Sequence, residues 1–134
     1  MDRLFGTDGI RGMPGKYPLT DGMIFKLGKA AAHLLLRRNS RKKAAAQPLK
    51  IIIGKDTRLS GQRIEVVLVS GISSYGVDVL LAGVISTPGL AFLTKELKAD
   101  MGVMVSASHN RAEENGIKFF SRSGYKLSKA QEDR

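Results

Sequence analysis

A short polar segment of the chain carries the side chains best suited to chemistry. Residues 106–110 read Ser-Ala-Ser-His-Asn and follow the apolar run Val103–Val105, which predicts a buried strand. Turn-forming residues come next, and a second predicted strand from Ile117 to Phe120 carries Lys118. Hydroxyl groups just beyond the C-terminal end of a strand lie where open α/β sheets expose reactive groups. Composition alone favours the simpler interpretation, a polar loop between two strands.

Ser108 is the candidate reactive residue of this segment. A serine hydroxyl is a poor nucleophile unless another group removes its proton. His109 is its immediate neighbour, but adjacent side chains of an extended segment point to opposite sides, which disfavours a hydrolase triad through this pair. The G-x-S-x-G motif of many hydrolases is also absent from the sequence. A serine can also carry a phosphate, a dianion that requires cations around it.

Two other segments suit phosphate chemistry. Residues 5–12 read Phe-Gly-Thr-Asp-Gly-Ile-Arg-Gly, so glycines flank Arg11, whose planar guanidinium matches phosphate oxygens. Residues 54–58 read Gly-Lys-Asp-Thr-Arg and separate a predicted strand from a helix predicted to begin near Gly61. A strand–loop–helix arrangement directs the loop at the carboxyl edge of a sheet. The spacing of a Walker phosphate-binding loop is absent.

These three segments, in this order, resemble the motifs of the α-D-phosphohexomutases, and most of all those of the phosphoglucosamine mutase branch. The third motif continues through Asn115-Gly116-Ile117-Lys118, and the resemblance covers nearly all 134 residues. It implies that Ser108 carries a phosphate, that Lys118 lies near the reacting hydroxyl of the substrate, and that Arg11 lies in the same pocket. The other polar residues implied for the phosphoserine loop are Ser106, His109 and Asn110.

The resemblance also implies a reaction. Family members transfer phosphate from the phosphoserine to a phosphosugar, let the resulting bisphosphate reorient, and recover the phosphate from its other end. In the phosphoglucosamine branch this interconverts glucosamine 6-phosphate and glucosamine 1-phosphate. The same family with a different sugar, a mannose or glucose phosphate, is an alternative that this chain leaves open, because the sugar-recognition loops of the family belong to its third and fourth domains.

A metal ion and further domains are implied by the same resemblance. One Mg²⁺ ion per active site would be bound by the phosphate on Ser108 and by an aspartate cluster of the second domain. This chain has no D-x-D-x-D pattern, so Ser108 would be its only ligand, and one oxygen does not hold Mg²⁺ tightly. The expected partners are therefore a phosphosugar and the remaining domains of a longer chain.

Arg111 departs from the family pattern, which usually has proline directly after the Ser-His-Asn triplet. Proline would fix the backbone angle φ at this position of the loop, and arginine does not.

The rest of the pattern predicts an α/β domain. Thr20 is a predicted N-cap for a long first helix, and Ser86 begins a third helix with Pro88 in its first turn. Apolar residues at helical spacing, Leu97 among them, are expected to face the core. The predicted strands are Leu49–Ile53, Val77–Leu81, Val103–Val105 and Ile117–Phe120. Alternating helices and strands predict a three-layer α/β/α domain with a mostly parallel, mixed sheet, whose last strand is antiparallel.

The C-terminal segment predicts that the chain is a part of a longer protein. Residues Tyr125–Ser128 are typical of the start of another helix, but the sequence stops at Arg134, which leaves room for only a turn or two. Together with the family resemblance, which implies four domains, this leads us to expect that residues 1–134 form the N-terminal, phosphoserine-loop domain of a four-domain enzyme.

The net charge and the composition limit which other classes of function the sequence could have. The net charge is +10, and residues 1–63 hold 14 Lys and Arg against 4 acidic residues. A basic nucleic-acid-binding module is therefore an alternative class, although aromatic residues make up only 6% and no nucleic-acid motif accompanies the charge. The chain has no cysteine, no apolar run long enough to span a membrane and no signal-peptide pattern, so we expect a cytoplasmic protein.

Overall fold

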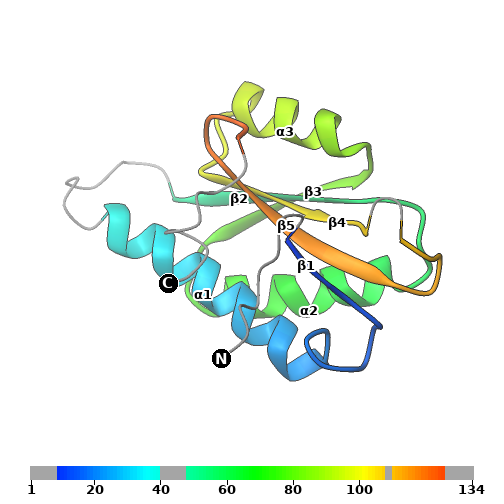
Figure 1. Cartoon of the computed structure of the whole chain (residues 1–134). Coiled ribbons are helices and arrows are strands. Elements are labelled where there is room, and N and C mark those ends of the chain that lie inside the picture. Colours follow the sequence, from blue (N-terminus) through cyan, green and yellow to red (C-terminus); the bar gives the residue numbers. More distant parts are fainter. Residues whose placement is uncertain (1–8, 40–47, 108–109, 126–134) are drawn as a thin grey trace.

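The computed structural model describes residues 9–39, 48–107 and 110–125 (Figure 1). These residues form five strands and three helices. In chain order the elements are β1 (Ile10–Gly12), α1 (Asp21–Asn39), β2 (Lys50–Lys55), α2 (Gly61–Ser73), β3 (Asp78–Val84), α3 (Thr87–Glu96), β4 (Met101–Val105) and β5 (Asn115–Ser121).

The five strands form one mixed sheet in the order β1-β5-β4-β2-β3. Strands β3, β2 and β4 are parallel neighbours, whereas β5 is antiparallel to both β4 and β1. Four of the five strands therefore run in one direction, and β5 alone opposes them. This confirms the prediction of a mostly parallel, mixed sheet whose last strand is antiparallel.

Helices cover both faces of the sheet, which confirms the three-layer prediction. Figure 1 shows α1 and α2 on one face and α3 on the other. The larger core cluster joins α1 and α2 to residues such as Ile51, Val103 and Ile117, and a smaller cluster lies under α3 around Ile52, Leu90 and Met104. Ile51 and Ile52 belong to different clusters because successive side chains of a strand point to opposite faces.

The helices α1 and α3 begin where the sequence predicted them to begin. The backbone N–H of Met23 donates to Oγ1 of Thr20 over 3.2 Å, so Thr20 caps α1. Gly89 N–H donates in the same way to Oγ of Ser86 over 3.1 Å, and Pro88 lies in the first turn of α3. Each hydroxyl satisfies an amide that the helix itself leaves without a carbonyl partner.

Helices α1 and α2 cross at two glycines. A Cβ atom on Gly28 would lie 2.6 Å from the carbonyl oxygen of Leu68, and one on Gly71 would overlap the carbonyl oxygen of Phe25. Both glycines are buried. The absence of side chains at these two positions therefore lets the helix backbones approach closely.

One strand was not predicted, one sequence-based expectation needs correction, and another lies outside the described residues. Residues Ile10–Gly12, in the glycine-rich segment around Arg11, form the edge strand β1, because the free edge of β5 offers them hydrogen-bond partners. Leu97, expected to face the core, follows the last turn of α3 and is 45% exposed. The predicted helix after Tyr125 falls on residues that the structure does not describe. None of the described helices is long and apolar enough to cross a membrane.

Candidate functional site

The loops that follow β2 and β4 lie side by side at the carboxyl edge of the sheet. The two strands are parallel neighbours, and their last residues, Lys55 and Val105, are paired. The backbone N–H of Asp56 donates to the carbonyl of Val105 over 3.1 Å, and that of Ser106 donates to the carbonyl of Gly116 over 2.9 Å. The two candidate motifs, which are about 50 residues apart in the sequence, therefore begin at one place.

Asp56 connects the two loops through its carboxylate. Its Oδ2 accepts a hydrogen bond of 2.7 Å from the hydroxyl of Ser106, and its Oδ1 accepts one of 3.0 Å from the backbone N–H of Arg58. Ser106 is only 4% exposed, so this hydroxyl is withdrawn from solvent. Hydrogen bonds to a charged carboxylate are stronger than those between neutral groups, and this one joins the first residue after β2 to the first residue after β4.

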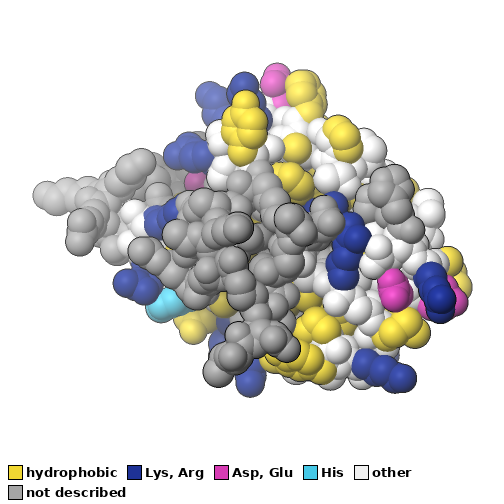
Figure 2. All heavy atoms as spheres, in the orientation of Figure 1, with side chains coloured by type: hydrophobic (Ala, Val, Ile, Leu, Met, Phe, Trp, Pro, Cys, Tyr) yellow, Lys and Arg dark blue, Asp and Glu magenta, His cyan; other side chains and the backbone are white. Residues whose placement is uncertain are grey.

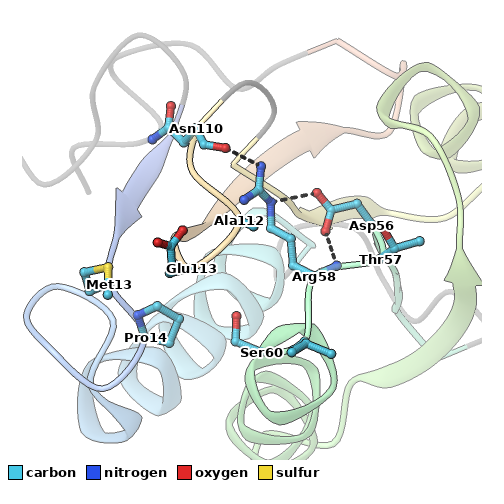
Figure 3. A pocket seen from close by; sticks show the side chains of 10 residues that line it. Met13, Pro14, Asp56, Thr57, Arg58, Ser60, Asn110, Ala112 and Glu113 are labelled. Atoms are coloured by element: carbon cyan, nitrogen blue, oxygen red, sulfur yellow. Dashed lines mark hydrogen bonds and ion pairs between the residues drawn. The ribbon is translucent and has the colours of Figure 1, made fainter.

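Arg58 extends this connection across the loop that leads to β5. Its Nε donates to Oδ2 of Asp56 over 3.0 Å, in an ion pair whose arginine side chain is 10% exposed. Its terminal nitrogens donate to three loop carbonyls: those of Asn110 and Glu114, each over 3.1 Å, and that of Arg111. Figure 3 shows the guanidinium between Asp56 and the backbone at Asn110.

Arg11 reaches the same loop from β1. Its Nη1 donates to Oδ1 of Asn110 over 2.8 Å. Arg11 is paired with Gly116 across the β1–β5 ladder, and a Cβ atom on Gly116 would lie 2.7 Å from the carbonyl oxygen of Ile10 and 3.1 Å from Cγ of Arg11. The glycine therefore leaves room for the arginine side chain, and the sequence prediction that Arg11 and Asn110 share a site is consistent with this geometry.

Lys118 lies on the same face of the sheet as Arg11. Residues paired across an antiparallel ladder share a face, and so do residues two apart in a strand. Arg11 is paired with Gly116, which is two residues from Lys118 on β5, and Lys118 is half-buried. A Cβ atom on Gly9 would lie 2.9 Å from Cγ of Lys118, so this glycine also makes room for a basic side chain.

The structure places four of the six predicted site residues near one another. Ser106 and Asn110 lie at the carboxyl edge of the sheet, and Arg11 and Lys118 lie on β1 and β5 with their side chains on one face of the sheet. Ser108 and His109 lie outside the described residues. Sequence reasoning assigned no role to Asp56 and Arg58, although it placed their motif at this edge. The signal that could have found them is the combination of an aspartate and an arginine in a strand–loop–helix connection.

A cavity of about 800 Å³ opens beside these loops (Figure 3). Its walls come from the segment after β1, from the β2–α2 loop and from the loop before β5. The lining residues are Met13, Pro14, Asp56, Thr57, Arg58, Leu59, Ser60, Asn110, Ala112 and Glu113. The cavity is large enough for a small polar ligand.

The described residues do not by themselves form a magnesium site. No group of three or more His, Cys, Asp or Glu side chains that could hold a metal ion occurs among them. The carboxylate of Asp56 lies at the site, but both of its oxygens accept hydrogen bonds from Arg58, and Oδ2 also accepts one from Ser106. Ser108, the ligand that the sequence predicts, is not among the described residues.

The basic side chains that the structure describes are not gathered into one surface on the face shown in Figure 2. Lys and Arg side chains lie there in several separate places, with acidic and apolar side chains between them. Among the described side chains, that face shows no contiguous basic patch of the kind that would favour a nucleic-acid-binding module.

Comparison with known sequences identifies the family. The profile described as "Phosphoglucomutase/phosphomannomutase, alpha/beta/alpha domain I" matches residues 2–134, and the chain belongs to this family. Curated relatives named phosphoglucosamine mutase include those of Syntrophotalea carbinolica, 54% identical over 93% of this chain, and Geobacter metallireducens, 53% identical over 95%. The chain spans 26% and 27% of the length of these two relatives.

Solved structures have the same fold. A putative phosphomannomutase from Thermus thermophilus matches with a TM-score of 0.80 and 30% identity, over 95% of this chain and 27% of that one. A phosphoglucomutase/phosphomannomutase family protein from Burkholderia thailandensis matches with a TM-score of 0.77 and 25% identity, over 97% and 28% of the two chains. The sequence comparison confirms the predicted family, and these two structures confirm the α/β/α fold.

Proposed function

We propose that residues 1–134 are the phosphoserine-bearing N-terminal domain of a phosphoglucosamine mutase. The observation that carries the proposal is the position of the loop after β4: it lies at the carboxyl edge of the sheet, and its Asn110 is hydrogen-bonded to Arg11. Identity above 50% to curated phosphoglucosamine mutases supports the choice of enzyme. Because the chain spans about a quarter of those relatives, the activity belongs to the whole protein.

In the proposed reaction, Ser108 donates and recovers a phosphoryl group. The bond between phosphorus and Oγ of Ser108 breaks as a free hydroxyl of the phosphosugar forms a new bond to phosphorus. Lys118 accepts the hydroxyl proton, and one proton is delivered to Oγ of Ser108, so the serine hydroxyl is restored as the sugar is phosphorylated. After the bisphosphate reorients, the reverse step returns its other phosphoryl group to Ser108. Arg11 stabilises the negative charge of the group in transfer, because phosphoryl transfer depends on positioning and electrostatic stabilisation.

The environment of Ser106 supports Ser108 as the modified residue. The Ser106 hydroxyl is buried and donates to the carboxylate of Asp56, so a phosphate on Ser106 would lie against a negative charge. Like charges held close together are destabilising, and an accessible hydroxyl is needed for both transfers. Ser108 is the other serine of the same loop.

Mg²⁺ would supply further charge neutralisation at the transferring phosphate when bound. From this chain, only the phosphate on Ser108 would bind the ion, and its remaining ligands would come from other domains. The cytoplasm, where sugar phosphates are made and used, is the proposed location.

Phosphomannomutase or phosphoglucomutase activity is the second candidate, because the Thermus thermophilus structure of the same fold is named a putative phosphomannomutase. The two candidates differ in the sugar and not in the chemistry of this domain. A full-length enzyme can be assembled by joining residues 1–134 to the remaining three-quarters of the Syntrophotalea carbinolica relative. This chimera tests whether the domain is competent, whereas the native full-length gene product must be assayed with glucosamine, mannose and glucose phosphates to identify the sugar.

The test of the phosphoserine uses the same assembled enzyme. Intact-mass and peptide mass spectrometry should find phosphate on Ser108, and Ser108→Ala should remove nearly all mutase activity. Ser123→Ala, at an exposed serine on the turn after β5, is the matched control and should retain activity. Phosphate on Ser106 with Ser108 unmodified, or normal turnover by Ser108→Ala, would overturn the proposal.

A further inference from the structure

The loop between β4 and β5 has few backbone hydrogen bonds of its own among the residues that the structure describes. Within residues 110–114, Asn110 N–H donates to the carbonyl of Ala107 over 3.1 Å, and Glu114 N–H donates to that of Arg111 over 3.0 Å. Three carbonyls of this segment, those of Asn110, Arg111 and Glu114, accept hydrogen bonds from Arg58. One side chain from another loop therefore contacts both ends of this segment.

We propose that Arg58, held by Asp56, is a positioning residue that fixes the conformation of residues 110–114. The consequence for catalysis, that holding this segment, which begins two residues after Ser108 in the sequence, supports phosphoryl transfer, rests on the proposed function. The role of Arg58 in holding residues 110–114 does not rest on it, because it follows from the contacts of Arg58 in this chain.

The geometry calls for arginine in particular. A guanidinium has five N–H donors in a rigid plane, so its Nε can bond a carboxylate while its terminal nitrogens bond several carbonyls. The ammonium of lysine has three donors on one nitrogen and does not span the same set. Asp56 completes the arrangement: it accepts from both the backbone N–H and Nε of Arg58, which sets the direction of the side chain.

Asp56 and Arg58 together hold residues at both ends of the connection between β4 and β5. Asp56 accepts from Ser106, directly after β4, and Arg58 donates to Glu114, directly before β5. Ser108 lies between these two fixed points in the sequence. A displacement of about 1 Å in a reacting group lowers rates by roughly 10²-fold, so the position of such a loop matters for turnover.

Hydrogen exchange in the 134-residue chain tests the hold directly and requires no activity. In Arg58→Lys, the amides of Asn110 and Glu114 should exchange at least about tenfold faster than in the wild type, because local opening becomes easier. Amides in the interior of β2 and β4 should keep their wild-type rates. Arg63→Lys is the matched control: Arg63 also bonds an aspartate, Asp21, but lies exposed on α2.

A second variant tests the same role if Arg58→Lys fails to fold. Asp56→Asn keeps the shape of the side chain but removes its charge, so it weakens the attachment of Arg58 and should raise the same two exchange rates by a smaller factor. Unchanged exchange at Asn110 and Glu114 in both variants, or equal acceleration throughout the sheet, would overturn the proposed role of Arg58.

Kinetics of the assembled enzyme test the consequence for catalysis. Arg58→Lys should lower kcat by about 10²-fold with KM for the sugar phosphate nearly unchanged, since the loop and not the sugar site is displaced. Faster loop exchange with normal kcat would overturn Arg58 as a positioning residue for the reaction. An inactive wild-type enzyme would instead contradict the proposed function, and the exchange experiment would still decide whether Arg58 holds the loop.

Discussion

Ser106 donates a hydrogen bond of 2.7 Å to the carboxylate of Asp56, although 50 residues separate the two in the sequence. The bond exists because β2 and β4 are parallel neighbours that end at the same edge of the sheet. It joins two of the three sequence motifs in one hydrogen-bonded unit, to which Arg58 adds the loop carbonyls.

Replacing Ser106 by alanine should therefore destabilise the chain without removing the proposed phosphorylation site. A hydrogen bond to a charged group contributes about 1.5–3 kcal/mol, so Ser106→Ala should lower the free energy of unfolding by this amount in urea titrations followed by circular dichroism. Ser123→Ala removes an exposed serine–serine hydrogen bond and should change stability by less than about 0.5 kcal/mol. Equal stability of the two variants would show that the Asp56 bond contributes little.

The helix crossing gives a second stability prediction. Adding a methyl group at Gly28 or Gly71 would force α1 and α2 apart, because the nearest atoms are backbone carbonyl oxygens that have no flexible side chain to move. Gly28→Ala and Gly71→Ala should each lower the free energy of unfolding by about 1–3 kcal/mol, the usual range for overpacking.

Gly22 supplies the matched control for this crossing. It lies in the first turn of α1, and a Cβ atom there would have no neighbour within 4 Å. Gly22→Ala should leave stability unchanged or raise it by up to about 1 kcal/mol, because alanine is the better helix former. A loss at Gly22 as large as at Gly71 would mean that the close approach of the helices is not the cause.

Much of the fold could be predicted from local signals, and the exceptions are places where distant contacts decide. Thr20 and Ser86 identify helix starts because a hydroxyl that caps a helix acts within three residues. Ile10–Gly12 contains one large apolar residue between glycines, and it forms a strand only because β5 has an edge to pair with. Leu97 matches the spacing of the core residues of α3, but the helix ends before it.

The candidate site also contains residues that the sequence identifies and residues that only distant contacts identify. The chemical types and the loop positions of Arg11, Ser106 and Asn110 are visible in the sequence. The role of Arg58 is not, because it depends on carbonyl groups 52 to 56 residues away, and carbonyl groups carry no sequence signal. Asp56 was missed for the same reason, since its partner Ser106 is equally distant in the sequence.

The exposed ion pair between Asp21 and Arg63 predicts a pH dependence. The hydrogen bond from Arg63 lowers the pKa of Asp21 below its ordinary value of 3.8. A carboxylate whose folded pKa is lowered stabilises the fold above its unfolded pKa, and this contribution is lost as the pH falls through the folded pKa. The difference in unfolding free energy between the wild type and Asp21→Asn should therefore be small at pH 7 and vanish below the pKa of Asp21.

The partner variant checks the origin of this effect. In Arg63→Met, Asp21 loses the donor that lowers its pKa, so replacing Asp21 by asparagine in this background should give a flatter pH profile. Both side chains are exposed, and screening by salt should reduce the difference further. A pH-dependent difference that persists in the Arg63→Met background would assign the effect to the position of Asp21 in the first turn of α1.

Lys118 is expected to act in the proposed transfer. In the assembled enzyme, Lys118→Met should lower turnover by about 10²-fold or more, the usual scale for acid–base groups. Lys26→Met, at an exposed lysine of α1, removes the same charge away from the sheet face that Arg11 and Lys118 share, and should retain activity. Near-normal turnover by Lys118→Met would leave Lys118 as a structural residue of β5.

The last prediction is that the 134-residue chain folds but does not catalyse. Its two core clusters lie on opposite faces of one sheet and include residues from all three helices, so cooperative unfolding is expected in urea. The described residues form no metal site, and the chain spans about a quarter of its curated relatives. Enclosure of reactants contributes roughly 7–11 kcal/mol to catalysis, and one domain alone does not enclose a bisphosphate between its two transfers. Purified residues 1–134 should therefore convert no glucosamine 6-phosphate above a no-enzyme control, even with Mg²⁺ and a bisphosphate activator, whereas the assembled enzyme should do so. Turnover by the isolated chain would show that this domain contains a complete site.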